Sequence, residues 1–198
     1  MTLSLPASLA AMHEDPTLMQ GVFALVQKLD GSKMVAGNWA EARQYAQALT
    51  MAAVARGDYV VLMHDLWDAV FSGVAKLGTI EQDPSDHHPK FIWDNGTLGK
   101  TVRLRKKLNS ASRLRFYVEY ELEEGDVYLS VGAFNKNDEQ VSLPEFLAQP
   151  DGWQCRGEVG WEHHFLFTER FRIENLPETI GKMAFLASRV VDACKGGS

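Results

Sequence analysis

The chain has 198 residues, of which 45% are hydrophobic and 23% charged, and its formal net charge is −6. This length suffices to bury one proper core without disulfides or metals, and it is short for two domains. The composition excludes a disordered protein, and apolar runs such as 59–63 are too short to span a bilayer. We therefore predict one domain, 1–198, with a helical subregion at 15–78 and a sheet plus terminal helix at 90–194.

Cysteine usage predicts the compartment. Cys155 and Cys194 are too few for a disulfide framework and too isolated for a zinc knuckle. We expect both to be free thiols in a reducing compartment. The first residues, 1–12, lack the basic stretch of a signal peptide. These features together predict a cytoplasmic location.

The first predicted helix follows a typical start signal. Asp15 and Pro16 are a suitable N-cap and first-turn pair, and Gly31 is a suitable end. Between them, apolar residues recur at the spacing of one helix face. These residues are Leu18, Met19, Val22, Phe23, Val26 and Leu29.

Two further helices are predicted before residue 79. Asn38 and Glu41 form a capping box that opens the second helix, which ends near Gly57. Asp58 then caps the third helix, which Gly78 ends. The stripe of the second helix is Trp39, Ala42, Ala46, Leu49 and Ala53; that of the third is Tyr59, Leu62, Met63, Leu66, Trp67, Val70, Phe71, Val74 and Leu77. The third stripe is broad, so we expect this helix to be central, and we expect Trp39 and Trp67 to lie in the core.

Beyond a polar loop at 79–89 the hydrophobic period changes from 3.6 to 2. A strand is predicted at 91–94, and Asn95-Gly96 is a strong hairpin-turn signal. Apolar and polar residues alternate without a break over 113–122, and 127–134 continues the pattern after an acidic turn. One apolar and one polar face are typical of an antiparallel sheet.

The C-terminal third completes the fold. Ser142 and Glu145 predict a short helix to about residue 149, strands follow at about 153–156 and 161–173, and Asn175 caps a last helix beginning at Leu176. The fold class is therefore α+β: an N-terminal helical half of about three helices, then an antiparallel sheet of four to six strands closed by a C-terminal helix that packs on its apolar face.

A basic segment is the clearest candidate site. Between 95 and 118 there are seven basic residues and no acidic one, in a chain that is acidic overall. Residues two apart share a face of a strand, so the arginines can converge into one patch for an acidic protein or for phosphates. Alternatively, cross-strand pairs with Glu119 and Glu121 neutralise them. The basic candidates are Arg103, Arg105, Lys106, Lys107, Arg113 and Arg115.

Three tryptophans extend this candidate surface. Trp93, Trp153 and Trp161 lie near predicted strand ends. Core packing is the favoured explanation of these rings, and a partner-binding surface is the best alternative, because an amphipathic ring at such a place often contributes to a contact surface. We add all three to the predicted binding residues.

Catalytic motifs are incomplete. The segment 95–101 has the glycines and lysine of a phosphate-binding loop, but Asp94 occupies the place of the first required glycine. Carboxylates followed by a lysine suit a metal-dependent nuclease, but the spacing fits no nuclease pattern. That set is Glu119, Glu121, Asp126 and Lys136.

Two histidine pairs raise the question of a metal. His87 and His88 lie in a proline-flanked loop, whereas His163 and His164 are neighbours on a predicted strand and must face opposite sides. We predict that the four do not form one metal site, and we predict no cofactor.

These observations favour a non-catalytic interaction module, an accessory or regulatory protein that binds another protein with an acidic surface and does not act at a membrane. Two alternatives stay open: a metal-dependent phosphoesterase or nuclease, and a nucleic-acid-binding protein that uses the segment 100–115.

Overall fold

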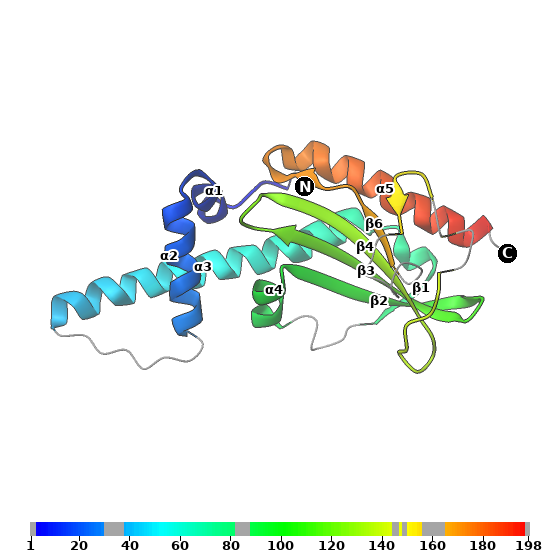
Figure 1. Ribbon diagram of the computed structural model, residues 1–198, viewed down its shortest axis with the longest axis horizontal. Coiled ribbons are helices and arrows are strands. Elements are labelled where there is room, and N and C mark those ends of the chain that lie inside the picture. Colours follow the sequence, from blue (N-terminus) through cyan, green and yellow to red (C-terminus); the bar gives the residue numbers. More distant parts are fainter. Residues whose placement is uncertain are drawn as a thin grey trace.

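The computed structural model describes residues 3–29, 38–81, 88–143, 147, 150–155 and 165–196. In this part of the chain, helices come first, a seven-stranded antiparallel sheet follows and a helix closes the fold (Figure 1), which confirms the predicted α+β class. The helices are α1 (Ala7–Glu14), α2 (Pro16–Leu29), α3 (Trp39–Val70), α4 (Pro89–Asn95) and α5 (Leu176–Gly196), with short 3₁₀ turns η1 (Val74–Lys76) and η3 (Ile173–Asn175). The strands are β1 (Gly78–Glu81), β2 (Thr97–Leu108), β3 (Ala111–Glu121), β4 (Asp126–Phe134), β5 (Trp153–Gln154), β6 (Phe165–Thr168) and β7 (Phe171–Arg172).

The long strands β2, β3 and β4 form the centre of the sheet. The strand order is β1-β2-β3-β4-β6-β5, and β7 also pairs with β4. On β3 the side chains alternate between buried and half-buried along the whole strand, as the sequence predicts. The sheet has one strand more than expected, because β1 lies in the segment predicted as a loop and the predicted strand at 161–173 is divided into β6 and β7.

The C-terminal half of α3 covers one face of the sheet, and α5 packs beside it (Figure 1). Two hydrogen bonds from aromatic side chains of α3 hold this helix against β3. The Trp67 Nε1–H donates to the carbonyl oxygen of Phe116, and the Tyr59 hydroxyl donates to that of Tyr120, both at 2.7 Å. Side chains of α3, the sheet and α5 form one continuous hydrophobic cluster. The helical and sheet regions therefore share a core.

The prediction of two helices on either side of Gly57 is wrong. One helix, α3, runs through the position, and Asp58 accepts a hydrogen bond from the Ser8 hydroxyl at 2.5 Å instead of capping a helix. The predicted cap at the start is confirmed, since the Asn38 side chain accepts from the Glu41 amide. Trp39 is not in the core: its side chain is 89% exposed, because this end of α3 extends beyond the sheet (Figure 1).

Replacing Gly57 with alanine is expected to raise the free energy of unfolding by about 0.5–1 kcal/mol, since alanine loses less backbone entropy in a helix interior. A Cβ atom at this position meets no other atom within 4 Å. Urea unfolding followed by circular dichroism measures the change. A loss of stability would contradict a continuous helix at Gly57.

The predicted strand at 91–94 with a hairpin turn at 95–96 is also wrong. These residues form α4, which begins at Pro89 and is capped by the His88 side chain, whose Nδ1 accepts from the Lys90 amide at 3.2 Å. Gly96 ends the helix in the left-handed conformation, with φ +64°. The proline at the first helical turn outweighs the strand propensity of the short apolar run, and Gly96 acts as a helix C-cap.

Some of the other predicted elements are confirmed. The cap of α2 is confirmed, because the Asp15 carboxylate accepts from the amides of Thr17 and Leu18. The strand predicted at 153–156 is present as β5, and the last helix begins at Leu176 as predicted. The short helix α1 was not predicted. Most of the helix predicted at 142–149, and residues 161–164, lie outside the described residues.

Candidate functional site

The face of the sheet opposite α3, here called the outer face, carries three of the predicted basic residues and the three carboxylates of the nuclease alternative. Strand pairing places residues of four strands side by side on it. From one end to the other, it changes from arginines through aromatic rings to carboxylates. Its members are Thr97, Gly99, Thr101, Arg103, Arg113, Arg115, Tyr117, Glu119, Glu121, Asp126, Tyr128, Ser130, Gly132, Phe134, Phe165 and Phe167.

Arg103 and Arg113 are direct cross-strand partners at the basic end. Both pair with Glu81 at the end of β1, the Nε atom of Arg113 at 3.1 Å. Arg113 also pairs with Asp138 at 3.1 Å. These two arginines are neutralised as the cross-strand alternative expects, but by Glu81 and Asp138 instead of Glu119 and Glu121.

Arg115 lies next to this pair and also makes internal contacts. Its Nε–H donates to the Thr101 hydroxyl at 2.9 Å, and its guanidinium lies 5.2 Å from the centre of the Phe134 ring. The side chain is half-buried. Arg115 therefore helps to hold β2 and the end of β4 together.

The remaining basic candidates lie at the tip of the β2–β3 hairpin. Arg105, Lys106 and Lys107 are exposed, and within the described residues none of their side chains forms an ion pair. The pairing explains their projection: its register shifts between Arg103 and Leu108, which leaves extra residues on β2. Such a bulge turns side chains away from the ladder. The structure thus divides the predicted patch into two groups. Arg103, Arg113 and Arg115 are held by contacts within the chain, whereas Arg105, Lys106 and Lys107 are exposed.

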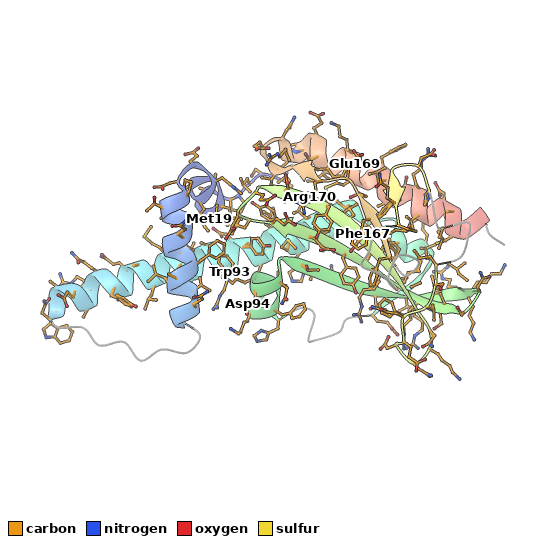
Figure 2. All side chains as sticks on the ribbon, in the orientation of Figure 1. Met19, Trp93, Asp94, Phe167, Glu169 and Arg170 are labelled. Carbon is orange, nitrogen blue, oxygen red and sulfur yellow. The ribbon has the colours of Figure 1, made fainter. Side chains whose placement is uncertain are left out.

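The tryptophans differ in their surroundings. Trp93 is half-buried on α4 (Figure 2). Its ring centre lies 5.4 Å from the ring centres of both Phe23 and Tyr59. Trp153 is only 3% exposed, and its Nε1–H donates to the carbonyl oxygen of Leu186 at 2.9 Å. Trp161 lies outside the described residues. Trp153 thus contributes to the core, whereas Trp93 lines the cleft described below.

Aromatic rings cover the centre of the outer face, which sequence reasoning missed. The Tyr117 ring lies over Gly99 and the Phe165 ring over Gly132, so close that a Cβ at either glycine would be 2.6 Å from ring carbons. A larger residue at either glycine would therefore force the ring above it to shift. The signal in the sequence is the pairing of glycine with an aromatic ring across neighbouring strands, which can be recognised only once the register is known.

Three carboxylates meet at the acidic end. Oxygen atoms of Glu121, Glu124 and Asp126 lie within 4.8 Å of one another. The Arg170 guanidinium already contacts all three, at 2.9, 3.1 and 3.7 Å. Lys136, the lysine of the nuclease alternative, follows the opposite end of β4, ten residues from Asp126. Since a strand rises about 3.3 Å per residue, the nuclease set is not brought together.

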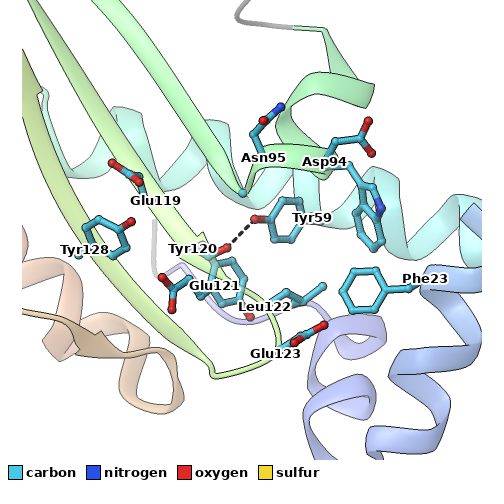
Figure 3. A pocket seen from close by; sticks show the side chains of 12 residues that line it. Phe23, Tyr59, Asp94, Asn95, Glu119, Tyr120, Glu121, Leu122, Glu123 and Tyr128 are labelled. Carbon is cyan, nitrogen blue, oxygen red and sulfur yellow. Dashed lines mark hydrogen bonds between the residues drawn. The ribbon is translucent and has the colours of Figure 1, made fainter. Parts of the chain in front are cut away.

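A cleft of about 250 Å³ opens beside the acidic end, where α2 and α4 approach the last residues of β3 (Figure 3). It is lined by aromatic rings and carboxylates. The lining residues are Phe23, Tyr59, Trp93, Asp94, Asn95, Gly96, Glu119, Tyr120, Glu121, Leu122, Glu123 and Tyr128.

A hydrogen-bonded cluster forms the base of this cleft. The Tyr59 and Tyr120 rings are stacked with centres 5.4 Å apart, and the Tyr120 hydroxyl shares a hydrogen bond with Nε2 of His13. Burial raises the pKa of both tyrosines, and it lowers the pKa of His13 despite the opposing effect of Glu174. All three side chains are therefore neutral near pH 7 and serve as a fixed support.

The remaining candidates are the histidines, as metal ligands, and the cysteines, as nucleophiles. His88 caps α4, and the other three predicted histidines lie outside the described residues. Cys155 and Cys194 are not joined in a disulfide. Burial raises the pKa of Cys155, and it raises that of Cys194 to about 12. Because the thiolate is the nucleophile, neither thiol is activated.

No helix among the described residues combines the length and apolar character needed to cross a membrane. Comparisons with protein-family models, with curated proteins and with solved structures found no match to this chain.

Proposed function

We propose that the chain is a non-catalytic interaction module, an accessory or regulatory protein of the cytoplasm that binds an acidic surface of another protein through the tip of its β2–β3 hairpin. The observation that carries this proposal is the cluster of three exposed cations, Arg105, Lys106 and Lys107, which form no ion pair with the described residues. The lack of a disulfide between Cys155 and Cys194 supports a reducing compartment.

The contrast with the neighbouring arginines supports this choice. Arg103 and Arg113 already hold carboxylates of the same chain, so a partner would have to displace Glu81 and Asp138 to reach them. A partner can bind Arg105, Lys106 and Lys107 without displacing any described carboxylate of the same chain. Charge complementarity at an exposed site mainly accelerates association and selects the partner.

A discrete acidic patch fits this tip better than an extended polyanion. The outer face becomes acidic towards Glu119 and Glu121, eight to ten residues along β3 from its start. At about 3.3 Å per residue, the acidic end begins roughly 25 Å away from the tip. A long nucleic acid lying along the face would meet these carboxylates, whereas a compact acidic site would not.

Changing Arg105, Lys106 and Lys107 together to glutamine is expected to weaken binding of a fluorescent ten-residue polyglutamate by at least about tenfold, which corresponds to roughly 1.4 kcal/mol. Fluorescence anisotropy at low salt measures the affinity. Thermal stability should hardly change, because the three side chains are exposed.

The matched control removes three positive charges from α5. Lys182, Arg189 and Lys195 each pair with a carboxylate, at 2.6, 2.6 and 2.9 Å, and changing them to glutamine alters the net charge equally. Equal weakening in both triple variants would contradict a specific tip site. Tighter binding of a 20-base-pair duplex, with a log–log salt slope of about −0.9 per phosphate contacted, would favour the nucleic-acid alternative.

A further inference from the structure

The cleft beside the acidic end forms because β3 continues past the start of β2. Thr97, the first residue of β2, pairs with Glu119, so β3 extends beyond its neighbour from Tyr120 onward. Gly96 closes this corner: its carbonyl oxygen accepts from the Tyr120 amide at 2.8 Å. A Cβ at Gly96 would be 3.0 Å from the Tyr120 carbonyl oxygen, so only glycine brings α4 this near.

Aromatic side chains from five elements line the cleft. The Trp93 ring of α4 lies between the rings of Phe23 of α2 and Tyr59 of α3, with its centre 5.4 Å from each of theirs. Tyr120 stacks on Tyr59, and Tyr128 stands near Glu119 across the cleft (Figure 3). The faces of such rings carry partial negative charge and attract cations within about 6 Å.

The lining also carries four carboxylates and no lysine or arginine among the described residues. Two have cationic partners outside the cleft: Glu121 pairs with Arg170 at 2.9 Å, and Asp94 with Lys90 at 3.4 Å.

The other two carboxylates, Glu119 and Glu123, have no ion pair within the described part of the chain. Glu119 instead accepts a hydrogen bond from the Ser130 hydroxyl at 2.6 Å. Burial raises the pKa of Tyr128, and the hydrogen bond and charge of Glu119 raise it further. The charge of the cleft is therefore not balanced by residues of the chain that the structure describes.

We propose that this cleft binds an alkylammonium group, with the half-buried rings of Phe23, Trp93 and Tyr128 as its walls and Glu119 and Glu123 as its counter-charges. The volume of about 250 Å³ is below the roughly 300–1,000 Å³ of pockets for drug-sized ligands, so it suits a single small head group. A hard metal ion would need several converging oxygens, whereas two of the four lining carboxylates, Glu121 and Asp94, are already paired with Arg170 and Lys90.

A contact at the rim shows the same chemistry within the chain. The Arg170 guanidinium lies 5.7 Å from the centre of the Tyr128 ring while it pairs with Glu121. An organic cation already rests here between an aromatic face and a carboxylate. The proposed ligand would repeat this arrangement inside the cleft. The site is independent of the hairpin tip, which lies at the other end of β3 (Figure 1).

Isothermal titration calorimetry with choline, and with its uncharged carbon analogue 3,3-dimethylbutan-1-ol, tests the proposal on the unaltered protein. Choline is expected to bind at least tenfold more tightly than the uncharged analogue. Equal affinities, or no binding of choline, would overturn the proposal. N-acetyl-trimethyllysine methylamide identifies the source of the ammonium group: affinity above that of choline indicates a modified lysine of a polypeptide, and equal or lower affinity indicates a free small amine.

The variant Glu119→Gln/Glu123→Gln is expected to weaken choline binding by at least tenfold. Glu124→Gln is the matched control, because Glu124 belongs to the same acidic end but does not line the cleft. Its affinity should stay within about threefold of the original. If the double variant does not fold, Glu123→Gln alone, at an exposed position, must still weaken binding measurably. Equal losses in the control and the cleft variants would overturn the proposal.

Discussion

Replacing Trp67 with alanine is expected to lower the free energy of unfolding by about 3–5 kcal/mol, the usual cost of truncating a buried tryptophan. The Trp67 ring lies between α3 and the sheet, 5.3 Å from the ring of Phe71. Its Nε1–H satisfies the Phe116 carbonyl oxygen, and the Lys100 ammonium lies 4.2 Å from its centre while pairing with Asp68. The substitution would remove the packing, the hydrogen bond and the cation–π contact together.

The same substitution at Trp39 is the matched control. That side chain is 89% exposed, so the expected change lies within about 0.5 kcal/mol. Urea unfolding followed by circular dichroism measures both variants. Similar losses at the two positions would mean that the N-terminal end of α3 is also packed, contrary to the structure. A loss below about 1 kcal/mol at Trp67 would contradict its central place in the core.

Replacing Gly78 with alanine is expected to cost about 1–3 kcal/mol or more, the range for inserting atoms into a filled site. A Cβ at Gly78 would lie 1.8 Å from the carbonyl oxygen of Arg103, so β1 and β2 could not keep their present pairing. Backbone atoms cannot turn aside as a side chain can. We expect β1 to shift and Glu81 to lose its contacts with Arg103 and Arg113.

Gly73→Ala serves as the control, since a Cβ there meets nothing within 4 Å and its φ of −76° suits any residue. Thermal unfolding should separate the two variants clearly. Hydrogen exchange of the β1 amides should increase in Gly78→Ala and stay unchanged in Gly73→Ala. Full retention of stability in Gly78→Ala would show that β1 does not approach β2 as closely as described.

The sequence by itself determined the elements whose pattern is long or whose cap is local. The alternation over 113–122 predicts β3, because a strand with one covered face repeats every two residues. Asp15 and Asn38 mark the starts of α2 and α3, because a capping side chain needs only the next few amides. The α+β class, the antiparallel sheet and the closing helix follow from such signals.

Tertiary structure decided the helix at Gly57 and the identity of α4, because local signals there conflict. Gly57 can end a helix, but the buried residues that follow, such as Tyr59 and Leu62, belong to the same packed face as those before it. The run at 91–94 is too short for its periodicity to distinguish a strand from a helix.

The candidate sites depend even more on pairing across the fold. Arg103 and Arg105 are equivalent in the sequence, yet register gives Glu81 to the first, while the bulge turns the second outward. The alkylammonium cleft combines Phe23 with Glu119, nearly one hundred residues apart. Contacts between distant segments decide which charges are neutralised and which aromatic rings enclose the cleft. Local sequence patterns do not encode those contacts, because the register of strands and the packing of helices select them.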